Sequence, residues 1–339
     1  MRNIMLHAAV VVLTALLPFS GLAQDLYVAD LGPTVSFDTN YQGGAIYRYT
    51  SDGARTTFAT NLTRPVSLAF DSAGNLFVSD LVRRTIYRYA PAGVPTAFAT
   101  VPAGPHGLAF DVAGNLFAAD NHTTIYRFTP AASRTTFASG LLAASALTFD
   151  ATGRLFVSDT GTNFNDARLY RFTPGGVRQT IATGLTACNG MAFDRAGDLF
   201  WADYFTGNIY KFATNGARST FTNGLNQPSG VAFNNGGELF VVETGADRIL
   251  RYRTNGARVT FALGLPYPTF LTFAPDPSLS IVPAPGRVTV NWTPPSTNYV
   301  LQLTTNLASG NWEVVTNAAP GTEFATTLSP AFFRLQRRQ

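Results

Sequence analysis

A short apolar segment that ends in Phe recurs six times along the chain, and this repeat restricts the folds open to the sequence. The segments lie at residues 68–70, 108–110, 147–149, 191–193, 231–233 and 271–273. The steps between their terminal Phe residues are 40, 39, 44, 40 and 40 residues. A period near 40 residues is typical of a β-propeller, in which each repeat forms one four-stranded blade. The repeat therefore predicts an all-β fold.

Each repeat contains four strand-like segments separated by turn residues. In the second repeat these segments are Leu68–Asp71, Asn75–Asp80, Ile86–Tyr89 and Thr96–Ala99. Gly, Pro and Asp between them are typical of tight turns. Aromatic residues make up 13% of the chain, which suits half-buried pleated surfaces.

The first repeat lacks an inner strand of its own and begins directly with Leu26–Asp30. The segment Leu271–Phe273 is left over at the other end of the array, and we expect it to supply the missing strand. Pairing the end of a ring with its start removes exposed sheet edges. The sequence thus predicts a six-bladed propeller over residues 24–275, closed by the C-terminal strand Leu271–Phe273.

Residues 1–23 have the pattern of a secretory signal peptide. Arg2 precedes an apolar run, and the small residues Gly21 and Ala23 follow it. We expect cleavage after Ala23 and delivery to the periplasm or the medium. No later segment reaches about 18 consecutive apolar residues, so we expect no membrane span.

Charge and cysteine content exclude some classes of protein. Removal of Arg2 with residues 1–23 takes the net charge from +4 to +3. Such a weak balance gives no reason to expect a nucleic-acid partner. Cys188 is the only cysteine, which excludes an intramolecular disulfide.

Insertions are confined to the connection between the second and third strands of a repeat. The step from second-strand to third-strand aromatic is ten residues for Phe77 to Tyr87, but fourteen and twenty in two other repeats. Insertions on one face of a repeat protein commonly mark its binding face. We therefore predict that the loops Leu31–Gly44 and Thr160–Ala167 lie on the binding face.

Aromatic, amide and carboxylate side chains gather in these loops and in the segments beside them. Aromatic rings next to hydrogen-bonding groups suit a carbohydrate, a peptide or another small molecule. The alternative is that the rings only pack the loops. The predicted binding residues are Phe37, Asp38, Tyr41, Asn163, Asp166, Ser145, Ser229, Tyr204 and Tyr267.

Every repeat also carries an acidic residue at the end of its second strand. A side chain found in every blade should serve every blade, so we interpret these acids as caps of backbone amides. A ring of metal ligands is the alternative. The residues are Asp30, Asp80, Asp120, Asp159, Asp203 and Glu243.

The pattern of Pro105–Asp120 resembles NHL repeats and gluconolactonase-like propellers, over about Asp25–Pro275. The resemblance implies a divalent cation such as calcium at the mouth of the central channel, held by Glu, Asn and Asp side chains. Asn189, followed by Gly190, matches the Asn. Ser229 stands in place of the Asp, and Arg64–Ser67 contains no Glu. A hard cation prefers several oxygen ligands, so Asn189 alone predicts a weak site.

His106 is a candidate catalytic residue, because it resembles the functional histidine of lyases built on related propellers. An imidazole suits acid–base chemistry near neutral pH. The alternative is a structural histidine. For Cys188 a small buried apolar role is favoured over a nucleophilic one, since no neighbouring base is identifiable.

After Pro275 the repeat ends and a different β pattern begins. Alternating segments at Val288–Trp292, Tyr299–Leu303, Trp312–Val315 and Phe332–Leu335 are separated by turn residues. We expect residues 276–339 to form a small β-rich module, similar to an Ig-like or fibronectin-like sandwich.

Two functions fit these observations. The first is a non-catalytic extracytoplasmic propeller that recognises a ligand through the binding face. The alternative is a metal-assisted lactonase or ester hydrolase, which rests on the resemblance to gluconolactonase-like enzymes. The missing carboxylates around Asn189 favour the first.

Overall fold

The computed structural model describes residues 24–33, 43–276, 278–284, 287–293, 299–304, 311, 313–316, 318, 321–325 and 332–337. The chain divides into two compact units. The larger comprises Ala23–Pro277 and Thr293–Ser296, and the smaller comprises Met1–Leu22, Ser278–Trp292 and Thr297–Gln339. Among the described residues, no helix is long and apolar enough to cross a membrane.

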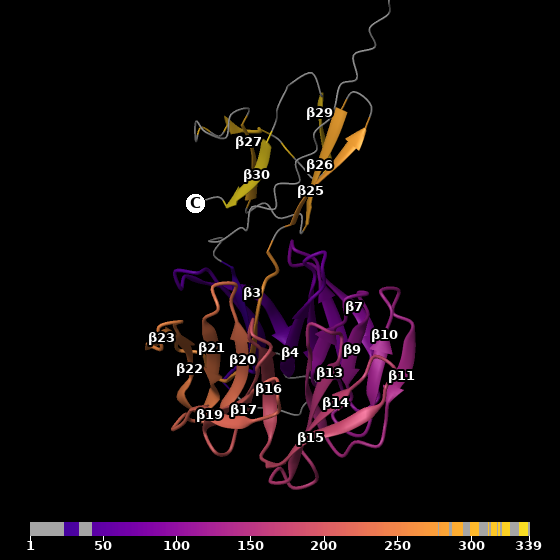
Figure 1. Cartoon of the computed structure of the whole chain (residues 1–339), viewed down its shortest axis with the longest axis vertical. Coiled ribbons are helices and arrows are strands. Elements are labelled where there is room, and N and C mark those ends of the chain that lie inside the picture. Colours follow the sequence, from indigo (N-terminus) through magenta and orange to yellow (C-terminus); the bar gives the residue numbers. More distant parts are fainter. Residues whose placement is uncertain are drawn as a thin grey trace, which may run out of the picture. The chain divides into compact units, whose positions relative to one another are not determined.

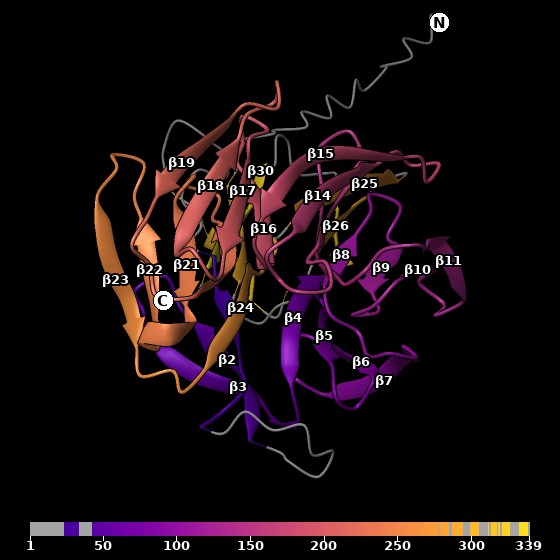
Figure 2. The same ribbon diagram turned by 90° about the horizontal axis from the view of Figure 1, so that it is seen from below.

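The larger unit is a ring of six antiparallel four-stranded blades (Figure 1). Blade 1 has the order β24-β1-β2-β3, and blades 2 to 6 each contain four strands that are consecutive in the chain. Figure 2 shows the blades around a centre, with β3, β7, β11, β15, β19 and β23 on the rim. The strands of blade 1 are β24 (Pro268–Phe273), β1 (Leu26–Asp30), β2 (Gly44–Tyr49) and β3 (Arg55–Leu62).

The other five blades have the following strands. They are β4 (Pro65–Phe70), β5 (Leu76–Asp80), β6 (Thr85–Tyr89), β7 (Pro95–Thr100), β8 (Leu108–Phe110), β9 (Leu116–Ala119), β10 (Ile125–Phe128), β11 (Arg134–Ala138), β12 (Ala144–Phe149), β13 (Leu155–Asp159), β14 (Ala167–Phe172), β15 (Arg178–Leu185), β16 (Cys188–Phe193), β17 (Leu199–Asp203), β18 (Asn208–Phe212), β19 (Arg218–Thr222), β20 (Pro228–Phe233), β21 (Leu239–Glu243), β22 (Arg248–Tyr252) and β23 (Arg258–Leu263).

The ring closes as the sequence predicts. Strand β24 pairs with β1, and the register places Leu26 opposite Phe273 and Val28 opposite Leu271. The closing strand is longer than the predicted segment, because pairing extends back to Pro268. The prediction of a six-bladed propeller is therefore confirmed.

The Phe that defines the repeat joins neighbouring blades. Phe110 at the end of β8 meets Phe77 of β5 edge to face, with ring centroids 5.0 Å apart. The same contact joins Phe149 to Phe117 and Phe273 to Phe240, again at 5.0 Å. Edge-to-face rings add about 1 kcal/mol beyond the area that they bury. The repeat is thus a repeated contact between blades.

Glycines in the inner strands allow neighbouring blades to approach at backbone distance. A Cβ atom on Gly107 would lie 2.1 Å from the carbonyl oxygen of Ser145. A Cβ atom on Gly190 would lie 2.5 Å from the carbonyl oxygen of Ser229. The Gly of this part of the repeat is therefore a packing requirement.

The second-strand carboxylates hold the segments that lead into the inner strands. Asp80 accepts hydrogen bonds from the backbone N–H groups of Thr63 at 2.8 Å and Arg64 at 3.1 Å. Asp159 accepts one from Ala143 at 2.7 Å. Backbone capping of this kind was the structural interpretation of these acids, and the contacts confirm it. It fixes the backbone that leads into β4 and β12, whereas Asp120 caps the N–H groups of His122 and Thr124 in its own following loop.

The smaller unit contains two three-stranded sheets with the orders β25-β26-β29 and β28-β27-β30. Val290, Trp292 and Leu301 are buried between them, with Phe324 and Phe333 packed alongside. The Ig-like or fibronectin-like class stays a prediction, and Trp312 lies outside the described residues. The strands are β25 (Ser278–Ala284), β26 (Arg287–Thr293), β27 (Tyr299–Thr304), β28 (Glu313–Val314), β29 (Thr322–Ala325) and β30 (Phe332–Arg337).

Candidate functional site

The channel mouth is the end of the ring where the inner strands begin. The strands of a blade alternate in direction, so the connections between second and third strands lie at the same end. We use the name channel mouth for the residues just before or at the start of the inner strands, together with these connections. Its side chains differ from blade to blade, unlike the acids below them.

Ser145 and Ser229, two of the predicted binding residues, are buried and join neighbouring blades. The Ser145 hydroxyl lies 2.6 Å from that of Ser158 and donates to the carbonyl of Cys188 at 2.7 Å. The Ser229 hydroxyl lies 2.6 Å from that of Thr244, which donates to the carbonyl of Pro268. These hydroxyls therefore hold blade 4 to blade 5 and blade 6 to blade 1.

His106 is partly buried at the start of the inner strand of blade 3. Burial, with a further contribution from the Arg64 cation, lowers the pKa of His106 to about 4. A hydrogen bond with the backbone of Ser145 opposes this shift. Because that bond favours the protonated ring, its acceptor must be the Ser145 carbonyl. A neutral imidazole that donates there keeps its other nitrogen as a proton acceptor at pH 7.

Arg64 and Tyr267 occupy the same position in neighbouring blades, one residue before the inner strand. They interact electrostatically with each other, and Arg64 also interacts with His106. The Tyr267 hydroxyl lies 3.5 Å from that of Tyr204, which belongs to the second-to-third strand connection of blade 5. The mouth therefore brings an imidazole, a guanidinium and two phenols into one cluster.

Phe205 and Phe164 extend this cluster outward. The rings of Tyr204 and Phe205 have centroids 5.3 Å apart, and those of Phe205 and Phe164 are 6.2 Å apart. Asn163 and Asp166, both predicted binding residues, are exposed in the same loop as Phe164. Phe37, Asp38 and Tyr41 lie outside the described residues.

The donor set around Asn189 does not suit a divalent cation. Ser229 is committed to the hydroxyl pair described above, and the Arg64 cation lies at the same end of the channel. Elsewhere at this end, Asp166 pairs with Arg168, and Glu243 pairs with Arg248. The described residues contain no group of three or more His, Cys, Asp or Glu side chains that could hold a metal. Among the residues that the structure describes, calcium would meet too few oxygen ligands here.

Cys188 is unsuited to nucleophilic chemistry. Burial raises the pKa of its thiol well above the usual range, so the reactive thiolate is disfavoured. The thiol donates to the carbonyl of Gly190 at 3.1 Å. This agrees with the structural role that the sequence favours.

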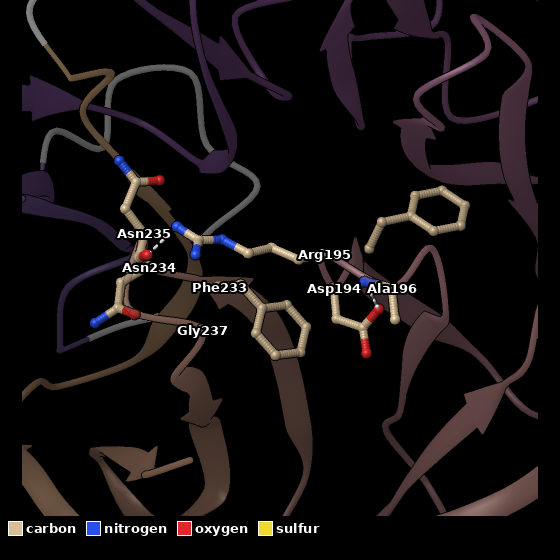
Figure 3. Close-up of a pocket in the computed structure, with 8 residues that line it drawn as sticks. Asp194, Arg195, Ala196, Phe233, Asn234, Asn235 and Gly237 are labelled. Atoms are coloured by element: carbon tan, nitrogen blue, oxygen red, sulfur yellow. Dashed lines mark hydrogen bonds between the residues drawn. The ribbon is translucent and has the colours of Figure 1, made fainter. Parts of the chain in front are cut away.

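A cleft of about 400 Å³ lies at the opposite end of the ring, between the first turns of blades 5 and 6. Phe193 and Phe233 line it together with the turn residues Asp194–Ala196 and Asn234, Asn235 and Gly237. Figure 3 shows the Arg195 side chain extending towards Asn235, whose carbonyl accepts its hydrogen bond. The sequence did not predict this cleft, because its residues belong to turns that every blade repeats.

Comparison with known proteins places the fold. A family model described as "SMP-30/Gluconolactonase/LRE-like region" matches residues 67–281. No curated protein matches the chain.

Three similar solved structures differ in what their titles describe. A gluconolactonase from Xanthomonas campestris is 19% identical, with a TM-score of 0.57 and coverage of 81% of this chain and 95% of the other. A calcium-binding protein, regucalcin, from Agrobacterium tumefaciens is 13% identical, with a TM-score of 0.54 and coverage of 68% and 82%. A catalytically inactive histidine-to-alanine variant of virginiamycin B lyase from Staphylococcus aureus, with quinupristin, is 17% identical, with a TM-score of 0.51 and coverage of 78% and 92%. At such identities the likeness shows a shared fold.

Proposed function

The chain belongs to the SMP-30/gluconolactonase/LRE-like family, and from that premise we propose that it hydrolyses a lactone or ester at the channel mouth, with His106 as the base. The observation that carries the proposal is the environment of His106. Burial and the Arg64 cation lower the pKa of His106 to about 4, so the ring is neutral at pH 7 and one ring nitrogen can accept a proton. The same shift makes the ring a weak base, and negative charge that develops on the substrate beside Arg64 would have to offset it.

The reaction has one addition step and one elimination step. His106 takes a proton from water as the water oxygen adds to the carbonyl carbon of the substrate. The bond from that carbon to the ring or ester oxygen then breaks, and the proton passes to the departing oxygen. A lactone gives one hydroxy acid, and an ester gives an acid and an alcohol.

Arg64 supplies the positive charge that the intermediate needs. Negative charge develops on the carbonyl oxygen as water adds, and a cation in a partly desolvated site stabilises that charge more than one in water. Arg64 is the cation that interacts with His106. We derive no step through a metal ion, because the residues around Asn189 do not suit one.

The test is hydrolysis of glucono-δ-lactone and p-nitrophenyl acetate by the mature chain. The reaction is measured at constant pH, with a chelator present, from the amount of acid released. We expect His106→Asn to lower kcat/KM at least about a hundredfold, the usual contribution of a positioned base. The matched control is His122→Asn, since His122 is exposed in the second-to-third strand connection of the same blade. Equal rates for the His106 variant and the wild type would remove the proposal.

A non-catalytic recognition propeller is the second candidate. It is supported by the described residues, which contain no group of three or more His, Cys, Asp or Glu side chains that could hold the cation expected in gluconolactonase-like enzymes. If the wild-type chain hydrolyses neither substrate yet binds a ligand through the same face, this candidate replaces the first.

Export is also a proposal. The N-terminal pattern supports cleavage after Ala23 and delivery to the periplasm or medium. N-terminal sequencing of the protein from cells and from medium would test both, and a mature product that still begins with Met1 would contradict them.

A further inference from the structure

Four aromatic side chains form a series of successive contacts on the mouth face of the ring. They are Tyr267, Tyr204, Phe205 and Phe164, and we call them the aromatic strip. The series starts at the Tyr204–Tyr267 hydroxyl pair beside Arg64 and ends in the loop between β13 and β14. It joins side chains that lie as much as 103 residues apart in sequence.

The outer end of the aromatic strip faces solvent. Phe164 is 54% exposed and Phe205 is 56% exposed, although each ring lies beside another aromatic ring. Phenylalanine side chains of a packed loop would be expected to turn inward. These two rings instead present apolar surface outside the core.

The backbone of Phe164 is held in an unfavourable conformation. Its φ is +62°, in the left-handed region that Phe rarely adopts. The Phe164 carbonyl accepts a hydrogen bond from the N–H of Ala187, at 3.0 Å, which ties the loop of blade 4 to blade 5. Strain kept in place by surrounding bonds is characteristic of functional positions. Here it fixes an exposed ring beside Phe205.

Polar groups flank the outer rings without leaving a net charge. Asp166 and Arg168 form an ion pair at 2.8 Å, and both side chains are exposed. Asn163 is exposed beside them. Flat rings can pack against the C–H face of a pyranose, while amide, carboxylate and guanidinium groups bond its hydroxyls. The balanced charge favours a neutral sugar.

We propose that the aromatic strip binds a polysaccharide chain of neutral pyranose units. The two exposed rings, Phe164 and Phe205, have centroids 6.2 Å apart and planes tilted by 56°, so each can contact a different sugar unit of an extended chain. The inference does not depend on the hydrolysis proposed above. Among the residues that the structure describes, no contact joins Phe164 or Phe205 to His106 or Arg64.

Isothermal titration of the mature chain with cellohexaose, xylohexaose and mannohexaose tests the proposal. We expect one of the three sugars to bind. In the double variant Phe164→Ala/Phe205→Ala, the Kd for that sugar should rise about a hundredfold, or about tenfold for each ring. The matched control is Phe221→Ala. Phe221 is also exposed, at 42%, but lies in the outer strand β19.

Two further measurements separate the possible outcomes. Circular dichroism should show that the double variant remains folded. The variant His106→Asn should bind the hexasaccharide as the wild type does, although it no longer hydrolyses the lactone or the ester. The proposal is overturned if the wild type binds none of the three sugars, if the double variant binds unchanged, or if Phe221→Ala weakens binding equally. Binding with failed hydrolysis would reject only the proposed enzyme.

Discussion

The two ends of the ring use the same blades in opposite ways. At the end opposite the mouth, which we call the turn end, the turn between first and second strands is capped in the same way in different blades. Asp71 accepts a hydrogen bond from the N–H of Asn75, and Asp111 accepts one from the N–H of Asn115, both at 2.8 Å.

At the mouth, equivalent positions carry several kinds of side chain, such as His106, Asn189 and Ser229. The cleft of about 400 Å³ is at the turn end, whereas the imidazole, guanidinium and phenol groups gather at the mouth. We therefore place the proposed site by variation between equivalent positions and not by concavity.

The largest effect on stability should come from the tight backbone approach at the mouth. Gly107→Ala would place a Cβ 2.1 Å from the Ser145 carbonyl, so we expect unfolding to be easier by about 3 kcal/mol. The control is Gly175→Ala at the turn end, where the nearest atom to a new Cβ would be 3.9 Å away. Urea unfolding midpoints measure both. If Gly107→Ala and the wild type unfold at the same urea concentration, the mouth is not closely packed.

The second effect is on the pH dependence of stability. His106 titrates near 4 when folded and near 6.5 when unfolded, so the unfolded chain binds a proton first as pH falls. Its stabilisation is complete above about pH 6.5, and up to about 3 kcal/mol should be lost by pH 4.

His106→Asn has no group that titrates in this window, so its stability should fall less between pH 7 and pH 4.5. Urea unfolding at three pH values, for this variant and the wild type, gives the comparison. Parallel pH dependences would show that His106 is not held neutral at the mouth.

The smallest effect should come from the turn-end cleft. Arg195 is exposed and donates to the Asn235 carbonyl, so Arg195→Ala should change the free energy of unfolding by less than about 0.5 kcal/mol. The rate of lactone hydrolysis should also stay at the wild-type value. A clear loss of either hydrolysis or sugar binding would place function at this end and reverse the comparison.

The repeat predicted the six blades, their strand order and their closure, because the terminal Phe of each inner strand is itself the contact between blades. The site was less predictable. Ser145 was predicted to bind a ligand, but its hydroxyl donates to the Cys188 carbonyl, 43 residues away. A single sequence cannot show such a partner on the next blade.

Arg64 was missed for a different reason, whereas Tyr267 was among the predicted binding residues. Arg64 stands one residue before its inner strand, at a position that the repeat pattern does not mark. The equivalent residues in the other blades are Gly104, Ala143, Ala187, Gln227 and Tyr267. A single cation at this position was the signal that could have indicated the cluster.

Closure by β24 also determines when the ring can be completed during synthesis. Ala29 and Phe270 are paired in the register, 241 residues apart, so strand β1 has no inner partner until nearly the whole propeller has been made. Contacts between such distant residues form slowly, and an unpaired strand edge is a site of association between chains. The final step of folding is thus the joining of the earliest strand to the latest, and a chain cut short before Pro268 would keep an open edge from which aggregation could start.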